Sequence, residues 1–101
     1  MSKLIKTKKG FTIIRLSHEE AVGIWGEYGG LGICDYCSKL PVSGGYYIPV
    51  LAMFYCPHCY KSWYRRAVYY QEDSWFEKAK LEETKTLLSY YRRRCAAGTQ
   101  Q

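Results

Sequence analysis

The chain has 101 residues, of which 48% are hydrophobic and 24% are charged, and its formal net charge is +6. A chain of this length forms one domain, and its apolar content excludes general disorder. The longest apolar stretch, residues 48–56, contains Pro49 and falls well short of the ~20 residues that a membrane-spanning helix needs. No apolar segment follows Met1, so we expect no signal peptide, no membrane partner and a cytoplasmic protein.

The basic excess is concentrated at the two ends of the chain. Four lysines within residues 3–9 and the three arginines at 92–94 account for seven of the fifteen basic residues, and the segment between them is nearly neutral. Short basic ends are usually solvated tails or helix ends, which is the structural expectation here. A basic surface also suits nucleic acid, so this class of partner stays open.

The first predicted elements are a strand and a short helix. Residues 11–16 are rich in β-branched and apolar side chains, which favours a strand. Ser17 and Glu20 have the spacing of a capping box, in which each side chain bonds the backbone N–H of the other residue. We therefore predict a short helix that begins at about residue 18 and ends at about Trp25.

Four of the five cysteines form two C-x₂-C pairs. Eighteen residues separate the pairs, a spacing typical of a zinc site, and the pairs comprise Cys34, Cys37, Cys56 and Cys59. Two intervening residues let both sulfurs of a pair reach one metal ion about 2.3 Å away, and two pairs complete a closed tetrahedral site of the structural kind. We predict that these four residues bind Zn²⁺. Iron in a rubredoxin-like site and disulfide bonds are alternatives, and Cys56 with Cys59 could form a thiol redox pair.

The segments around the cysteine pairs predict the local fold of the metal site. Glycines flank the first pair, as in a zinc knuckle, and residues 46–55 are suited to a hairpin with Pro49 at its bend or edge. Pro57 is typical of a first helical residue, so Cys56 should cap that helix and Cys59 should lie in its first turn. Knuckle, β-hairpin and helix in this order make a treble clef.

Two helices are predicted after the second cysteine pair. Apolar side chains recur at helical spacing over residues 60–68 and indicate a helix that ends near Tyr70. The S-x-x-E sequence of residues 74–77 resembles a capping box, so a long helix is expected over about residues 74–95. Its apolar stripe comprises Leu81, Thr84, Leu88, Tyr91 and Cys95. Residues 96–101 lack an apolar pattern and are expected to be disordered.

Three further features bear on function. Cys95 lies on the apolar stripe and is expected to be a buried thiol, with a fifth ligand or an intermolecular disulfide as alternatives. His58 lies between two ligands of an already complete set and is expected to point outward. Several of the eleven tyrosines neighbour arginines, a combination that suits stacking on unpaired bases, a protein interface or ordinary core packing.

The run YGGLGICDYCSKLP at residues 28–41, followed by YCPHC at residues 55–59, resembles the zinc finger of the DksA/TraR family of bacterial transcription regulators. The family carries a tyrosine–glycine lead-in, a C-x₂-C knuckle and a second C-x₂-C that opens a helix. The resemblance spans about residues 28–70 and implies metal ligation by the same four cysteines. In that family a long coiled-coil arm precedes the finger and enters RNA polymerase. Here 33 residues without a long heptad pattern precede Cys34, so that activity is not transferred.

These features predict one α+β domain over residues 1–101. It should contain a short N-terminal strand and helix, a treble-clef zinc module over about residues 28–70 and a long C-terminal helix. No catalytic acid–base pair, open metal position or phosphate-binding glycine loop is evident, so we expect no enzyme. We predict that the chain is a zinc-binding module that binds nucleic acid or acts in regulation. The alternative is protein–protein interaction, including a homodimer through Leu81, Leu88 and Tyr91.

Overall fold

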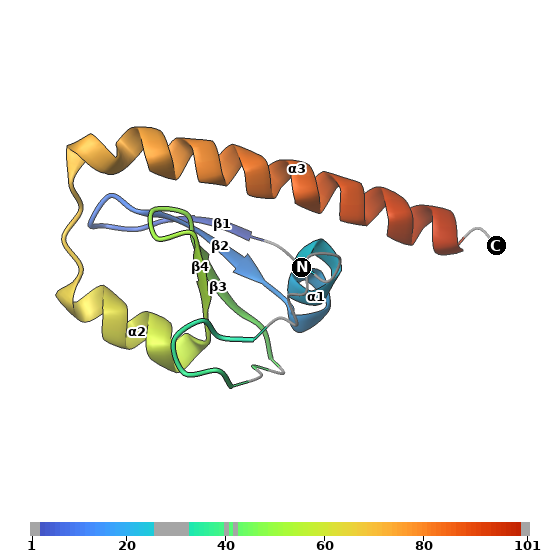
Figure 1. The fold of residues 1–101 in the computed structure, drawn as a ribbon, viewed down its shortest axis with the longest axis horizontal. Coiled ribbons are helices and arrows are strands. Elements are labelled where there is room, and N and C mark those ends of the chain that lie inside the picture. The colour runs from blue at the N-terminus through green and yellow to red at the C-terminus, as the bar shows by residue number, and fades with distance from the viewer. Residues whose placement is uncertain (1–2, 26–32, 40, 42, 100–101) are drawn as a thin grey trace.

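The computed structural model of the chain describes residues 3–25, 33–39, 41 and 43–99, without the side chains of residues 25 and 94–99. In chain order the elements are β1 (Lys3–Lys6), β2 (Thr12–Leu16), α1 (His18–Trp25), β3 (Gly45–Ile48), β4 (Met53–Tyr55), α2 (Pro57–Arg66), the 3₁₀ turn η2 (Gln71–Asp73) and α3 (Ser74–Thr99). The four strands form one antiparallel sheet with α3 on one side and α2 on the other (Figure 1). The predicted α+β class is confirmed.

The sheet divides the interior into two parts. On the α3 side, the buried side chains are Ile14, Leu16, Ala21, Ile24, Tyr47, Phe54 and Leu88. On the α2 side, they are Phe11, Ile13, Cys34, Ile48, Tyr55, Cys59 and Trp63. Successive residues of each strand contribute to opposite sides, as the pleat of a strand requires. Two of the predicted metal ligands therefore belong to the core between the sheet and α2.

The first strand corrects the expectation of a solvated basic tail at the N-terminus. Residues Lys3–Lys6 pair along β2, with Ile5 opposite Ile13. The side chain of Ile5 packs against the core on the α2 side, so this short segment has a buried anchor. Lys3 and Lys6 consequently lie on a folded sheet edge, and Lys8 and Lys9 lie in the turn between β1 and β2.

The predicted helix after β2 is confirmed together with its capping box. The Ser17 N–H donates to Glu20 Oε1 (2.9 Å), and the Glu20 N–H donates to Ser17 Oγ (3.1 Å). Later in this helix, Gly23 faces α3: a Cβ built on it would lie only 2.1 Å from a ring carbon of Tyr91. Glycine at this position allows α1 and α3 to approach closely.

The capping box predicted at the start of the long helix is wrong. The Glu77 carboxylate is buried and accepts a hydrogen bond from the Thr12 N–H (3.0 Å) instead of turning back to Ser74. The pairing of β2 with β3 covers only residues 14–16 of β2, so it supplies no acceptor at Thr12. The carboxylate takes the place of that strand acceptor, because a buried N–H without a partner is costly.

Helix α2 ends at Arg66, four residues before the predicted end near Tyr70. Ala67 has an extended backbone (φ −72°, ψ 139°), and Val68 is 63% exposed instead of lying on the core face. The extended segment brings the Tyr69 ring edge-on to Phe11, with 5.3 Å between ring centroids. Aromatic packing outside the helix therefore replaces the last helical turn that the periodicity favoured.

The long helix extends to Thr99, beyond the predicted end near residue 95. Thr84 and Leu88 of its stripe are buried, and Leu81 and Tyr91 pack against the same core. The Cys95 side chain lies outside the described part, so its predicted burial stays a prediction. None of the described helices is both long and apolar enough to cross a membrane.

Candidate metal centre

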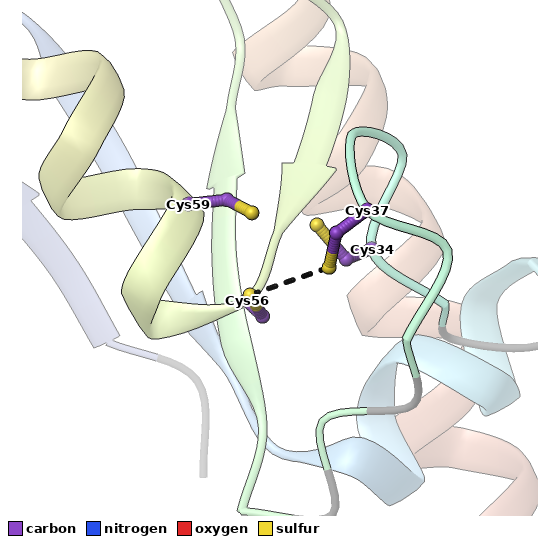
Figure 2. Close-up of side chains that lie close together, drawn as sticks. All are labelled: Cys34, Cys37, Cys56 and Cys59. Atoms are coloured by element: carbon purple, nitrogen blue, oxygen red, sulfur yellow. Dashed lines mark hydrogen bonds between the residues drawn. The ribbon is translucent and has the colours of Figure 1, made fainter.

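The four predicted ligands converge at one point. The sulfur atoms of Cys34, Cys37, Cys56 and Cys59 all lie within 4.8 Å of one another. Figure 2 shows the first two on the loop before β3, Cys56 between β4 and α2, and Cys59 on α2, with the sulfurs directed inward. Of the cysteines whose side chains are described, all four have free thiols. The structure thus brings together every residue that the C-x₂-C spacing selected.

The second pair is positioned by the start of α2. Cys56 is the N-cap with an extended backbone (φ −66°, ψ 162°), and Pro57 follows it as the first helical residue. The Tyr60 N–H donates to the Cys56 carbonyl oxygen (2.9 Å), which closes the first turn and brings the Cys59 sulfur toward that of Cys56. Unpaired backbone N–H groups and the helix dipole favour thiolates at such a helix start.

The first pair is held by a tight turn. The Ser38 N–H donates to the Cys34 carbonyl oxygen (2.9 Å), and the Cys34 N–H donates to the Lys39 carbonyl oxygen (3.0 Å). Ser38 has a left-handed backbone (φ 63°), which reverses the chain after Cys37. The turn places both sulfurs of this pair on the side that faces α2.

Asp35 fixes this turn to the hairpin that leads to the second pair. The Asp35 N–H donates to the Phe54 carbonyl oxygen (2.8 Å), and the Phe54 N–H donates to Asp35 Oδ2 (2.8 Å). Phe54 lies in β4, one residue before Tyr55 and two before Cys56. These two hydrogen bonds set the distance between the two halves of the site. Sequence analysis missed this role, although an acidic residue inside a ligand turn was the available signal.

Burial and hydrogen bonding act in opposite directions on the thiols. Burial raises the pKa of the Cys34 thiol, but hydrogen bonds from nearby backbone N–H groups, chiefly those of Cys37 and Cys56, outweigh it and bring the pKa to about 7. Burial raises the pKa of the Cys59 thiol, and its hydrogen bonds with the other three cysteines raise it further. Of these two thiols, Cys34 therefore loses its proton more readily, and the positive charge of a bound metal ion would favour the thiolate form of Cys59.

One sulfur–sulfur distance equals the value expected around a tetrahedral metal ion, and none of the others exceeds 4.8 Å. Ligands about 2.3 Å from a tetrahedral Zn²⁺ lie about 3.8 Å from one another. The sulfurs of Cys37 and Cys56 are 3.8 Å apart, far longer than the ~2.05 Å of a disulfide bond (Figure 2). Four cysteine sulfurs are a donor set that zinc prefers, and iron in a rubredoxin-like site uses the same set.

A shallow recess with basic and hydroxyl side chains lies beside the cysteines. Its volume is about 70 Å³, and it is lined by Tyr36, His58, Cys59, Ser62 and Arg66. His58 is exposed, in agreement with its predicted outward orientation. Tyr36 is 66% exposed, and its ring lies edge-on to that of Tyr55 at 5.9 Å. Hydrogen-bond donors thus surround an opening at the surface next to the metal centre.

A second missed residue, Lys9, stabilises the far end of α2. Its Nζ donates to the carbonyl oxygens of Tyr64 (2.6 Å), Arg65 (3.4 Å) and Ala67 (3.0 Å). It also lies over the Tyr64 ring, 4.7 Å from the centroid. A cation at a helix C-terminus satisfies unpaired carbonyl groups and complements the helix dipole. One lysine of the basic N-terminal group is thus a structural cap.

Comparisons with protein-family models, with curated proteins and with solved structures found no match. The tyrosine–glycine lead-in of the DksA/TraR resemblance, residues 28–32, lies outside the described residues.

Proposed function

We propose that the chain is a non-enzymatic zinc-binding module of the treble-clef type that binds nucleic acid through the exposed face of α2. The convergence of four cysteine sulfurs within 4.8 Å supports the metal part of this proposal. The order of ligand turn, hairpin β3–β4 and helix α2 around those sulfurs supports the treble-clef type. The resemblance of residues 28–70 to DksA/TraR-type fingers points to the same ligand set.

A structural role for the metal follows from the closed ligand set. Four thiolates fill a tetrahedral Zn²⁺ and leave no position for a substrate. Cys34 and Cys59 are buried members of the core on the α2 side, so the ion would tie the hairpin, the ligand turn and α2 together. Structural Zn²⁺ contributes about 10–16 kcal/mol in small peptides, which is comparable to the net stability of a whole domain.

The outer face of α2 supports nucleic acid as the partner. The helix contains no acidic residue, and its exposed side chains are His58, Lys61, Ser62, Arg65 and Arg66. Phosphate groups bind lysine and arginine through charge and accept hydrogen bonds from hydroxyl groups. The exposed Tyr36 ring beside this face is a surface on which an unpaired base could stack.

A salt titration of oligonucleotide binding tests this proposal. The zinc-loaded chain is mixed with labelled single-stranded and duplex oligonucleotides, and fluorescence anisotropy gives the affinity at several salt concentrations. We expect affinity to fall steeply with salt, because bound phosphates release counterions. Replacing Lys61 and Arg66 with glutamine should weaken binding and reduce the slope of log K against log salt by about 2.

A matched variant separates the α2 face from net charge. Replacing Lys78 and Arg93 of α3 with glutamine removes one lysine and one arginine, both exposed, at a distance from the metal centre. This control should bind nearly as well as the unchanged chain. Equal losses in both variants would show that only net charge matters, and no binding at low salt would contradict the nucleic-acid proposal.

The predicted homodimer through the C-terminal helix receives no support from the stripe that suggested it. Leu88 is buried, and Leu81 and Tyr91 are partly buried against the chain's own core on the α3 side, so much of their apolar surface is already covered. Protein–protein interaction remains the second candidate function. The observation that favours it is the edge of the sheet formed by β1.

A further inference from the structure

The two edges of the sheet differ in how their backbone groups are satisfied. At the β4 edge, the N–H and C=O of Phe54 both bond to Asp35 of the ligand turn. At the β1 edge, no strand or loop of the described residues pairs with the outer side of the strand. An open edge is a place where an extended chain can add as a further strand.

The register shows which groups of β1 point outward. The Thr7 N–H donates to the Phe11 carbonyl oxygen (2.9 Å), which makes this a hydrogen-bonded position of the β1–β2 pairing. Such positions recur every two residues, so Ile5 and Lys3 also bond toward β2. The N–H and C=O groups of Leu4 and Lys6 consequently point away from the sheet, toward the open edge.

A groove lies alongside this edge, between the sheet and α3. It has a volume of about 330 Å³ and is lined by Lys3, Leu4, Ile14, Lys85, Leu88 and Arg92. Its apolar part includes Leu4, whose side chain is 53% exposed. Three of the six lining side chains are basic and none is acidic. Lys85 forms an exposed ion pair with Glu82 on its own helix (3.7 Å), and such surface pairs are weak.

We propose that the β1 edge and this groove bind an extended, acidic segment of a partner protein, which adds to the sheet as a fifth strand. The outward backbone groups of Leu4 and Lys6 would supply the hydrogen bonds of the new pairing. Apolar side chains of the segment would contact the exposed Leu4, and its carboxylates would lie near the basic rim. This inference concerns a surface separate from α2, so it can fail without affecting the proposed nucleic-acid binding.

The charge of the β1 edge favours an acidic segment over a second copy of the chain. Edge pairing of two β1 strands would bring the lysines of one strand, Lys3 and Lys6, close to those of the other. Lysines on an edge strand disfavour such self-pairing, because like charges repel in a poorly solvated interface. The same lysines attract carboxylates, so charge strengthens the binding of an acidic segment and weakens the pairing of two copies.

The probe for this proposal is a labelled octapeptide with both ends blocked, in which valine and glutamate alternate at the odd positions, so that both face the groove, and serine fills the even positions. Its binding to the full, zinc-loaded chain is followed by fluorescence anisotropy. We expect saturable binding, and we expect loss of binding when lysine replaces every glutamate. A version with an N-methyl group on every amide keeps the side chains but has no N–H left on either edge, so it cannot pair as a strand and its affinity should fall at least about tenfold.

Two pairs of variants locate the binding site. Leu4→Asp places a like charge against the peptide and should weaken binding at least about tenfold, whereas Val68→Asp, at an equally exposed apolar residue outside the groove, should not. Circular dichroism and zinc content establish that both variants fold. If Leu4→Asp does not fold, Lys85→Glu replaces it, with Lys78→Glu as the matched change elsewhere on α3.

Amide hydrogen exchange gives the decisive readout. Bound peptide should slow exchange at Leu4 and Lys6, whose N–H groups point outward, and leave Lys3 and Ile5 unchanged. Equal binding of the N-methylated or lysine peptide, or no binding at ~1 mM peptide, would overturn the proposal. It would equally be overturned if an oligonucleotide displaced the peptide and protected the same amides. Protection of these amides without peptide, in a concentration-dependent dimer, would make a second copy the occupant.

Discussion

Asp35 and Phe54 bond to each other as two paired strands would, although only Phe54 belongs to a strand. The backbone N–H of Asp35 meets the Phe54 carbonyl oxygen, and the Asp35 carboxylate replaces the carbonyl that a neighbouring strand would offer. The pair closes the β4 edge of the sheet and holds the first ligand turn against the second. A single side chain thus serves both the sheet and the metal centre.

Replacing Asp35 with alanine should therefore loosen the metal site. The Phe54 N–H loses its acceptor, and we expect a loss of about 1–2 kcal/mol in the free energy of unfolding. Asp35→Asn keeps an oxygen acceptor and should lose less. Zinc affinity, measured by competition with a chelator, should follow the same order, because metal binding and ordering of the ligand turn are coupled. Equal zinc affinity in all three proteins would contradict the positioning role of Asp35.

Removal of the metal should unfold the part of the chain around it. Chelation of Zn²⁺ is expected to abolish the cooperative thermal transition of hairpin β3–β4 and α2, because the thiols alone cannot hold these elements together. Cys→Ser at any one of the four ligand positions should have the same effect. Far-ultraviolet circular dichroism and metal analysis by mass spectrometry measure both outcomes, and the latter distinguishes zinc from iron.

Cys95 offers the matched control for the ligand variants. Its replacement by serine should leave one metal ion bound per chain, since the four ligands are complete without it. A cooperative melt that persists after full chelation would show that the metal is dispensable. Loss of metal on replacing Cys95 would show that the ligand set is wrong.

Glu77 should contribute to stability from the interior. Replacing it with alanine leaves the buried Thr12 N–H without an acceptor, which is expected to lower the free energy of unfolding by about 1–3 kcal/mol. The matched change Glu83→Ala removes an exposed carboxylate of the same helix and should stay within about 0.5 kcal/mol. Urea denaturation compares the two, and similar values would mean that the Thr12 hydrogen bond contributes little.

Local rules predicted each half of the cysteine cluster well, because the geometry of each pair is encoded over short distances. Two intervening residues bring the sulfurs of each pair together, and Pro57 fixes where α2 begins. The Ser17–Glu20 capping box is equally local, and it formed as predicted. In each case the partners lie within one turn of chain, so distant residues have little chance to override the pattern.

The predictions that failed concern segments whose structure depends on a group far away in the sequence. The S-x-x-E sequence at the start of α3 is as good a capping box as the first one, but Thr12 of β2 offers Glu77 a buried N–H. The apolar period over residues 60–68 favoured a longer α2, but Lys9 caps it and the Tyr69 ring packs on Phe11. All three contacts span more than fifty residues of sequence, so no local pattern reveals them.

Lys9 gives a direct test of that long-range cap. Lys9→Met keeps most of the aliphatic chain but removes the ammonium group that three carbonyls share, and we expect a loss of about 1 kcal/mol. Lys8→Met, at the exposed neighbouring position, should leave stability nearly unchanged. Hydrogen exchange should quicken in the last turn of α2 in the first variant alone. Equal exchange in both variants would mean that the cap is not formed in solution.

The capping box of α1 should make stability depend on pH in a predictable direction. Burial raises the pKa of the Glu20 carboxyl, but hydrogen bonds with Ser17 lower it more, so its pKa in the folded chain lies below the ordinary value of 4.5. A lowered pKa means that folding favours the carboxylate. The contribution of the Glu20 carboxylate to the free energy of unfolding is therefore complete above pH 4.5. It disappears as the pH falls through the pKa that Glu20 has in the folded chain.

Glu20→Gln isolates this contribution, because glutamine still accepts the Ser17 N–H but does not titrate. At neutral pH the unchanged chain should be more stable than this variant, and the difference should shrink toward zero in acid. Acid would also release a bound metal ion, but it would do so in both proteins, so this effect is common to the two. Glu19→Gln removes the same charge from an exposed position in the same turn and serves as the control. A Glu20 difference that stayed constant from neutral pH to pH 3, about 1.5 units below the ordinary value, would contradict the lowered pKa.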